Sequence, residues 1–293
     1  MPVYEQTYRS FEGGPALRWR WRFVAAQELR VLAVSRVFKF LVFLGGLHYL
    51  FRVMQIVAFD IVAQDPNNPL APLLQRADIF YISGQTFYDF ISYQLTLMFV
   101  TLLYAGSGMI CNDVRNNLPE VYFSKPLRWY DYLTGKLLAL FVVGFCLTAG
   151  MALLLLLQHA LMSPSWEVAI DCLRWSIGAL GYSAAAVLPS ALFILLCSCL
   201  VNGQNYAAIT VIMTIIANTA LAAMFAETLR YQNWYVFSVP VAVGHVGEKL
   251  FQLARPQIAL TIPWTYSLLY VAGFSLVCLV FLVIRVRKME VAS

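Results

Sequence analysis

Six long apolar runs dominate this chain, and polar segments of different lengths separate them. Each run has about twenty residues or more, the length that an α-helix needs to cross a hydrocarbon core about 30 Å thick. Only helices and closed barrels satisfy their backbone in lipid, and the strand alternation of a barrel is missing here. The pattern predicts an all-α integral membrane protein with six spans, at residues 37–59, 89–111, 133–157, 176–200, 205–226 and 264–285.

The composition agrees with a membrane protein and argues against a soluble domain. Hydrophobic residues make up 61% of the 293 residues and charged residues only 12%, whereas a soluble domain is roughly a quarter charged. The net charge of +5 would suggest nucleic acid in a soluble chain, but membrane topology explains it here, so we expect no nucleic-acid partner. The six cysteines form no CxxC pair, and we expect neither a disulfide framework nor a metal site.

The distribution of Lys and Arg predicts how the spans are oriented. If both termini lie on one side, fourteen of the twenty Lys and Arg fall on that side. The positive-inside rule then places both termini in the cytoplasm. We accordingly divide the chain into a cytoplasmic N-terminus at 1–36, a single six-span domain at 37–285 and a cytoplasmic tail at 286–293.

Residues 17–36 predict an amphipathic helix that lies along the cytoplasmic membrane interface. Its arginines can reach anionic head groups, although Glu28 interrupts its apolar side. That side would hold Trp21, Val24, Ala25 and Leu32. The alternative is that the first span begins early and carries a basic flank.

The apolar segment 234–246 is too short to cross a membrane. It contains Pro240 and Gly244, and a further span here would place the basic C-terminus outside. We therefore expect a pair of re-entrant or interfacial half-helices before the last span.

The chain lacks a phosphate-binding loop. Its only Gly-Lys pair, Gly135-Lys136, has Tyr130 where the first glycine of that loop should stand. No motif of a hydrolase or metalloprotease is present either. We therefore expect no catalytic residue and no cofactor bound by this chain.

Two ionisable residues of the first run are candidates for a translocation path. His48 and Arg52 are four residues apart and share a helix face, and ionisable groups at membrane depth are often functional. The alternative is that Arg52 extends to the membrane surface and that His48 is neutral and hydrogen-bonded within the bundle.

The loop at 115–136, between the second and third runs, has the most informative polar pattern. Asn117 and Glu120 are three residues apart, which is the spacing of a capping box. They predict a short helix over 118–123, which Pro126 would prevent from continuing.

Interfacial side chains after this short helix would hold it against the membrane. Lys136 would extend its amine to the membrane surface, and the aromatic anchors would be Trp129, Tyr130 and Tyr132. The helix would then present apolar and aromatic side chains to a cytoplasmic partner. The alternative is an ordinary basic loop whose aromatic residues all contact lipid.

Residues 108–139 resemble the corresponding loop of ABC transporter permeases of the type-2 exporter class. That family shows an acidic residue after the second span, a short helix, and an SxPxxRxxYxxGK stretch that enters the third span. The matching residues here are Ser124, Pro126, Tyr132, Gly135 and Lys136, whereas Arg128 stands slightly early for the arginine of the pattern. The interfacial entry helix, the six spans and the short apolar pieces before the last span resemble the family more loosely, and the long first outside loop departs from it.

The resemblance implies that the helix at about 117–123 is a coupling helix that docks on a separate ATPase subunit. The docking residues would be Arg115, Asn117, Glu120, Val121, Tyr122 and Phe123. The family works with two ATPase subunits, which use ATP and Mg²⁺, and with a second permease copy, identical or homologous. We expect the bacterial cytoplasmic (inner) membrane as the location, with lipids and an extracytoplasmic accessory protein as further partners.

Two other classes of function compete with an ATP-driven exporter. A secondary transporter or channel would need several acidic residues in mid-span, and an intramembrane enzyme would need a convergent catalytic set. The spans hold neither pattern. The sequence therefore favours the exporter, whereas its cargo stays open.

Overall fold

The computed structural model describes residues 19–64, 82–123, 127–163, 166–253, 256–258 and 260–292. All regular elements in this part of the chain are helical, and six helical segments are long and apolar enough to cross a membrane. Five of the predicted spans lie within α2 (Arg36–Gln64), the α7–α8 segment (Trp129–Met162), α9 (Trp166–Leu200), α10 (Gln204–Thr228) and α12 (Trp264–Ala292). The prediction of six membrane-length helices is therefore confirmed.

The second predicted span, 89–111, lies within the membrane-length segment Gly84–Arg115, which is interrupted by a turn. Helix α4 (Gly84–Gly106) ends before the predicted boundary, and a turn over 107–110 leads into the short helix α5 (Cys111–Arg115). At its start, the Ser83 N–H donates a hydrogen bond to Thr86 Oγ1 at 3.3 Å, so one unpaired donor of the first turn is satisfied.

Helix α9 begins ten residues before the predicted start of its span. At about 1.5 Å per residue, its 35 residues extend about 52 Å, well beyond a hydrocarbon core of about 30 Å. Its first part carries the exposed pair Asp171 and Arg174, whose charged atoms are 3.7 Å apart. An apolar run marks only the lipid-embedded part of a helix, so the sequence underestimated its length.

The third span contains a π-helical segment that the sequence did not predict. Helix α7 (Trp129–Phe145) passes through η1 (Cys146–Gly150) into α8 (Met151–Met162). Thr148 Oγ1 donates to the Gly144 carbonyl at 2.8 Å within this turn. A π turn adds one residue to the helical repeat. The face that α8 presents to its neighbours is therefore rotated relative to the face of α7.

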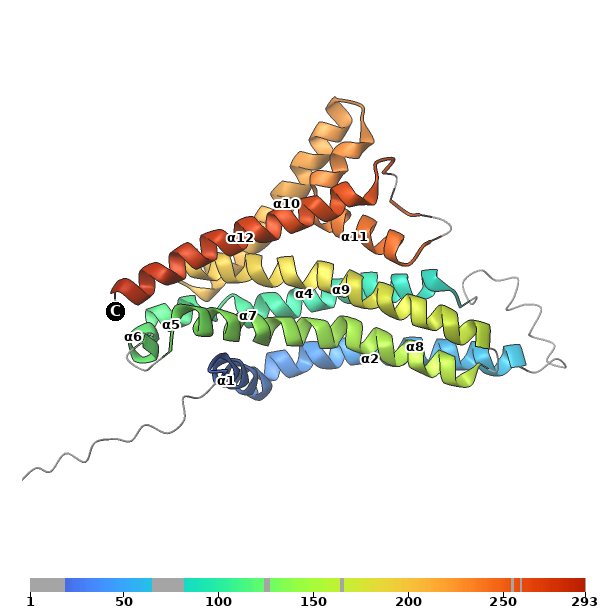
Figure 1. The fold of residues 1–293 in the computed structure, drawn as a ribbon, viewed down its shortest axis with the longest axis horizontal. Coiled ribbons are helices and arrows are strands. Elements are labelled where there is room, and N and C mark those ends of the chain that lie inside the picture. The colour runs from blue at the N-terminus through green and yellow to red at the C-terminus, as the bar shows by residue number, and fades with distance from the viewer. Residues whose placement is uncertain are drawn as a thin grey trace, which may run out of the picture.

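Helix α9 forms the centre of the bundle and packs against α4, α7, α8 and α12. In its most apolar stretch 67% of the residues are buried, against 11% for both α2 and α10. Figure 1 shows α10 leaning away from the other long helices. The apolar sides of α2 and α10 are therefore left for lipid or for another protein.

The short helices lie at the two ends of the bundle. Helices α1 (Trp21–Val34), α5 and α6 (Leu118–Phe123) gather at the end where α12 terminates (Figure 1). The backbone of Ser35 is extended, so α1 is a helix separate from α2 and not an early start of the first span. The segment predicted as two half-helices forms the 3₁₀ turn η2 (Gln232–Phe237) and α11 (Val239–Leu250).

Candidate functional site: helix α6 and the charge network beside it

The short helix predicted over 118–123 is present as α6 and packs against α5 and α12. Three of the predicted docking residues, Arg115, Asn117 and Glu120, are exposed. The side chain of Val121 is 54% exposed, so an apolar group faces outward beside these polar ones. The side chain of Phe123 and residues 124–126 lie outside the described residues.

Tyr122 lies on the inner side of α6. Its ring is 5.6 Å from the ring of Tyr132 on α7, and it packs against the apolar core. Burial, followed by the charge of Asp113, raises the pKa of its phenol. Tyr122 therefore attaches α6 to the bundle, which leaves Glu120 and Val121 as the residues best placed for an outside partner.

Asn117 takes a different structural role from the predicted one. Its φ of 53° lies in the left-handed region, and its N–H donates to the Val114 carbonyl at 3.2 Å. Asparagine tolerates this conformation, which commonly ends a helix. Asn117 therefore terminates α5, whereas a residue that caps the start of α6 would have an extended backbone.

A buried charge network lies beside α6 and joins three helices. Lys136 on α7 is fully buried, and its Nζ is 2.5 Å from Glu28 Oε1 on α1 and 2.8 Å from Asp113 Oδ2 on α5. Nζ also donates to the Met109 carbonyl at 2.8 Å, so three oxygen atoms surround its ammonium group. Tyr132 donates its hydroxyl hydrogen to Asp113 Oδ2 at 2.8 Å. The four side chains of the network therefore fix one another's positions.

The prediction that Lys136 extends to the membrane surface is wrong. A lone lysine at the start of a span lowers its energy by reaching water, but here two carboxylates from other helices surround the amine. Glu28, which interrupted the predicted apolar side of α1, is one of them. The interruption was a sign of this contact, although its partner stands 108 residues later in the chain.

Gly135 explains why α1 can approach α7 so closely. A Cβ atom on Gly135 would lie 2.6 Å from Val24 Cβ and 2.9 Å from the Trp21 carbonyl oxygen, both on α1. Tyr132, Gly135 and Lys136 are spaced three and one apart, so they share the face of α7 that meets α1 and α5. Three of the residues that carried the sequence resemblance therefore form one contact surface.

Helix α9 supports the same network from a further direction. Ser198 Oγ accepts hydrogen bonds from the backbone N–H groups of Ile110 and Cys111, at 3.1 and 3.2 Å. These donors belong to the start of α5, where helical partners are missing. The C-terminal part of α9 thus fixes α5, which carries Asp113.

His48 and Arg52 do not join this network. His48 Nδ1 lies 2.8 Å from Gln94 Oε1, and its ring stacks on Phe90 at 5.0 Å. Arg52 donates to Gln55 Oε1 at 2.6 Å on its own helix. His48 also lines an apolar groove of about 500 Å³ between α2 and α4. Gln94 supplies His48 with a polar partner inside the bundle, while a role of either residue in a translocation path stays a prediction.

A second buried polar pair was missed by the sequence analysis. His159 Nδ1 on α8 lies 3.0 Å from Asp60 Oδ2 on α2, and both residues are buried. His245 contacts Ser267 instead, with 2.8 Å between Nδ1 and Oγ. The three histidines therefore have different partners, and within the described residues no group of three His, Cys, Asp or Glu could hold a metal ion.

A comparison with protein-family models finds no match to this chain, and a comparison with curated proteins finds none either.

Proposed function

We propose that this chain is the membrane-spanning permease subunit of an ATP-driven ABC transporter of the type-2 exporter class. The observation that carries the proposal is the placement of the exposed helix α6 beside the buried network of Glu28, Asp113 and Lys136. A docking surface that transmits force needs a rigid attachment to the spans, and these contacts supply one. ATP and Mg²⁺ would bind to two separate ATPase subunits.

The charge distribution supports a cytoplasmic position for this end of the bundle. Exposed basic residues gather there on α5, α12 and the start of α7, namely Arg115, Arg128, Arg287 and Lys288, and the positive-inside rule assigns such an end to the cytoplasm. In this proposal both termini are cytoplasmic, in a bacterial inner membrane. Helix α1 lies along the inner membrane interface, and η2 and α11 enter the outer leaflet without crossing it.

The proposed mechanism follows the contacts inward from α6. A push on α6 reaches α7 through the packing of Tyr122 on Tyr132. Lys136 then carries the displacement to α1 and α5, because its amine is bound to carboxylates on both. The start of α7 therefore moves as one body with α1 and α5. A second permease copy would pack on the exposed apolar sides of α2 and α10.

The proposal is tested by charge-reversing the exposed part of α6 and measuring assembly. Glu120→Arg combined with Val121→Asp should abolish co-purification of ATPase subunits from a native host, because an interface core tolerates neither change. The matched control is Glu227→Arg with Leu229→Asp at the other end of the bundle, where Leu229 is likewise 54% exposed. The control should retain the ATPase.

Two results would overturn the proposal. Retention of ATPase subunits by the α6 variant would remove α6 as the docking site. Purification of the native complex without any ATPase, together with transport by the lone chain in liposomes without ATP, would favour a secondary transporter or channel instead.

A further inference from the structure

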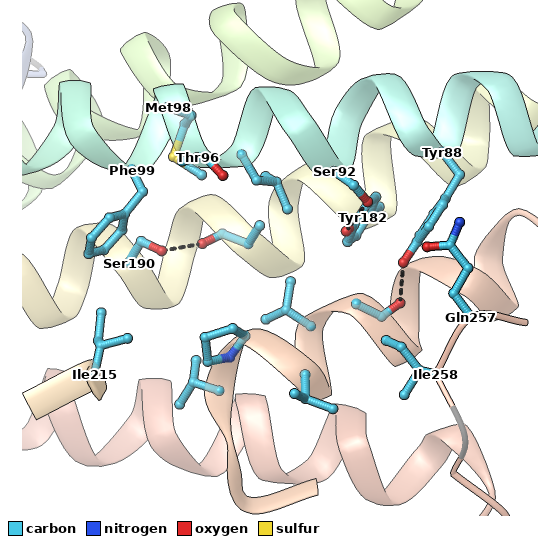
Figure 2. Close-up of a pocket in the computed structure, with 17 residues that line it drawn as sticks. Tyr88, Ser92, Thr96, Met98, Phe99, Tyr182, Ser190, Ile215, Gln257 and Ile258 are labelled. Atoms are coloured by element: carbon cyan, nitrogen blue, oxygen red, sulfur yellow. Dashed lines mark hydrogen bonds between the residues drawn. The ribbon is translucent and has the colours of Figure 1, made fainter. Parts of the chain in front are cut away.

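A cavity of about 520 Å³ lies between α4, α9, α10 and α11. Figure 2 shows that its walls come from helices far apart in the chain, with Phe99 on α4, Ser190 on α9 and Ile215 on α10 facing a common space. Cavities that bind small ligands typically measure about 300–1,000 Å³. This one is large enough to hold a ligand and is separate from the network around Lys136.

The lining of the cavity carries no charged residue. Its apolar end is formed by Met98, Phe99 and Ile215, and its more polar end by Tyr88 and Gln257 (Figure 2). Such a lining would bind a charged ligand poorly, because nothing would compensate the lost hydration. It suits a molecule with a long apolar part and an uncharged polar part.

Several hydroxyl groups in the wall already have partners within the protein. Ser190 donates to the Ala186 carbonyl at 2.7 Å, and Ser92 Oγ lies 3.0 Å from the Tyr182 hydroxyl. The hydrogen bond from Tyr88 to the Gly244 carbonyl is longer, at 3.4 Å. These hydroxyl groups therefore need no hydrogen bond from a ligand. A ligand could form a hydrogen bond at the end of the cavity that holds Tyr88.

We propose that this cavity binds the hydrocarbon chain of a bilayer phospholipid, with the ester region of the lipid at the end formed by Tyr88 and Gln257. Three of its four walls are membrane spans, so lipid chains are the apolar molecules that surround it in the membrane. The chain would occupy the end near Met98 and Ile215. The proposal does not depend on the ATPase partner.

Glu248 on α11 acts as a positioning residue for one wall of the cavity. Its Oε1 accepts the backbone N–H groups of Gln257 and Ile258, at 2.7 and 2.9 Å, and the residue is only 1% exposed. Both of these residues line the cavity. A buried carboxylate therefore holds this wall against α11.

Gly244 allows α11 to lie close to Ile258 and Tyr88 at this end of the cavity. A Cβ on Gly244 would lie 2.7 Å from Ile258 Cδ1 and 3.6 Å from the Tyr88 hydroxyl. A larger residue would push the wall outward or fill the polar end of the cavity. The shape of this end thus depends on Glu248 and Gly244 together.

The experiment uses the purified chain in liposomes of phosphatidylcholine that carries a photoactivatable diazirine near the end of one acyl chain. After illumination and digestion, mass spectrometry should find the lipid attached to the segments around Met98 and Ile215. Ser190→Phe fills the cavity and should lower that labelling about tenfold relative to the unchanged protein.

Ser176→Phe is the matched control. Ser176 also lies on α9 and donates to the carbonyl four residues earlier, Cys172, at 2.7 Å, but it does not line the cavity. This variant should keep full labelling. If Ser190→Phe does not fold, Ile215→Phe fills the same space from α10.

Two outcomes would overturn the proposal. One is equal labelling of the cavity segments in the Ser190→Phe and Ser176→Phe proteins. The other is labelling of α2 and α10 with none on the α4 segment around the buried Met98, which would mean that lipid surrounds the protein without entering the cavity.

Discussion

Replacing Lys136 with methionine should strongly destabilise the protein. The change removes the cation that lies 2.5 Å from Glu28 and 2.8 Å from Asp113 but keeps much of the apolar stem. Two carboxylates would then face each other in a largely dry space. Removing one partner of a buried ion pair typically costs about 3–5 kcal/mol, because the remaining charge is left uncompensated.

Thermal unfolding of the purified protein in detergent measures this loss. The chain offers a built-in probe, because Cys111, Cys172, Cys197, Cys199 and Cys278 are buried and react with a thiol-specific dye only on unfolding. On the scale of soluble domains, where 1 kcal/mol shifts Tm by about 2–4 °C, the expected decrease is roughly 6–20 °C. The exposed Cys146 reacts with the dye before unfolding and gives the baseline signal of the folded protein.

A neutral version of the network separates the electrostatic cause from a packing defect. The triple variant Lys136→Met, Glu28→Gln and Asp113→Asn removes all three charges with side chains of similar size, so no uncompensated buried charge remains. Its Tm should recover most of the loss. An unchanged Tm of the single variant would mean that Lys136 does not stabilise the fold. A triple variant no more stable than the single one would mean that packing, and not charge, causes the loss.

Three further changes have defined outcomes. Gly135→Leu should detach α1 from α7, because even a Cβ would lie 2.6 Å from Val24 Cβ; limited proteolysis should then cut the α1–α2 junction much faster. Tyr132→Phe removes the hydrogen bond to Asp113 at 2.8 Å and should lower the free energy of unfolding by about 1.5–3 kcal/mol, measured with the same thiol dye. Burial raises the pKa of the Glu248 carboxyl above its ordinary value of 4.5, so the folded state binds this proton more tightly than the unfolded state and stability falls as pH rises through the folded pKa. Glu248→Gln should remove this part of the pH dependence of Tm, and an unchanged profile would contradict the assignment.

The number of membrane-length helices and their places in the chain followed from the sequence, because lipid imposes a simple rule. A backbone without water must satisfy its own hydrogen bonds, so about twenty apolar residues become a helix whatever surrounds them. The short helix α6 was also predicted from local signals, although Asn117, the expected cap of its start, ends α5 instead. Local signals failed where a helix continues past its apolar run, as at the start of α9.

Only part of the candidate site was predicted from the sequence. Lys136 stood out within a recognisable stretch, but the sequence alone gave it an interfacial role, since nothing nearby identifies Glu28 as its partner. The pair of Asp60 and His159 is separated by 99 residues and was missed for the same reason. Pairing of distant polar groups depends on which helix faces meet, and no local pattern encodes that.

The sequence by itself thus determined that this protein has six membrane-length helices and a polar loop with a short exposed helix, because both follow from local chemistry. Only the tertiary structure decided what that short helix is attached to. It placed three helices around one lysine and left an uncharged cavity between four others. Those features arise where side chains from distant parts of the chain satisfy one another, and the low polarity around them makes each such contact decisive.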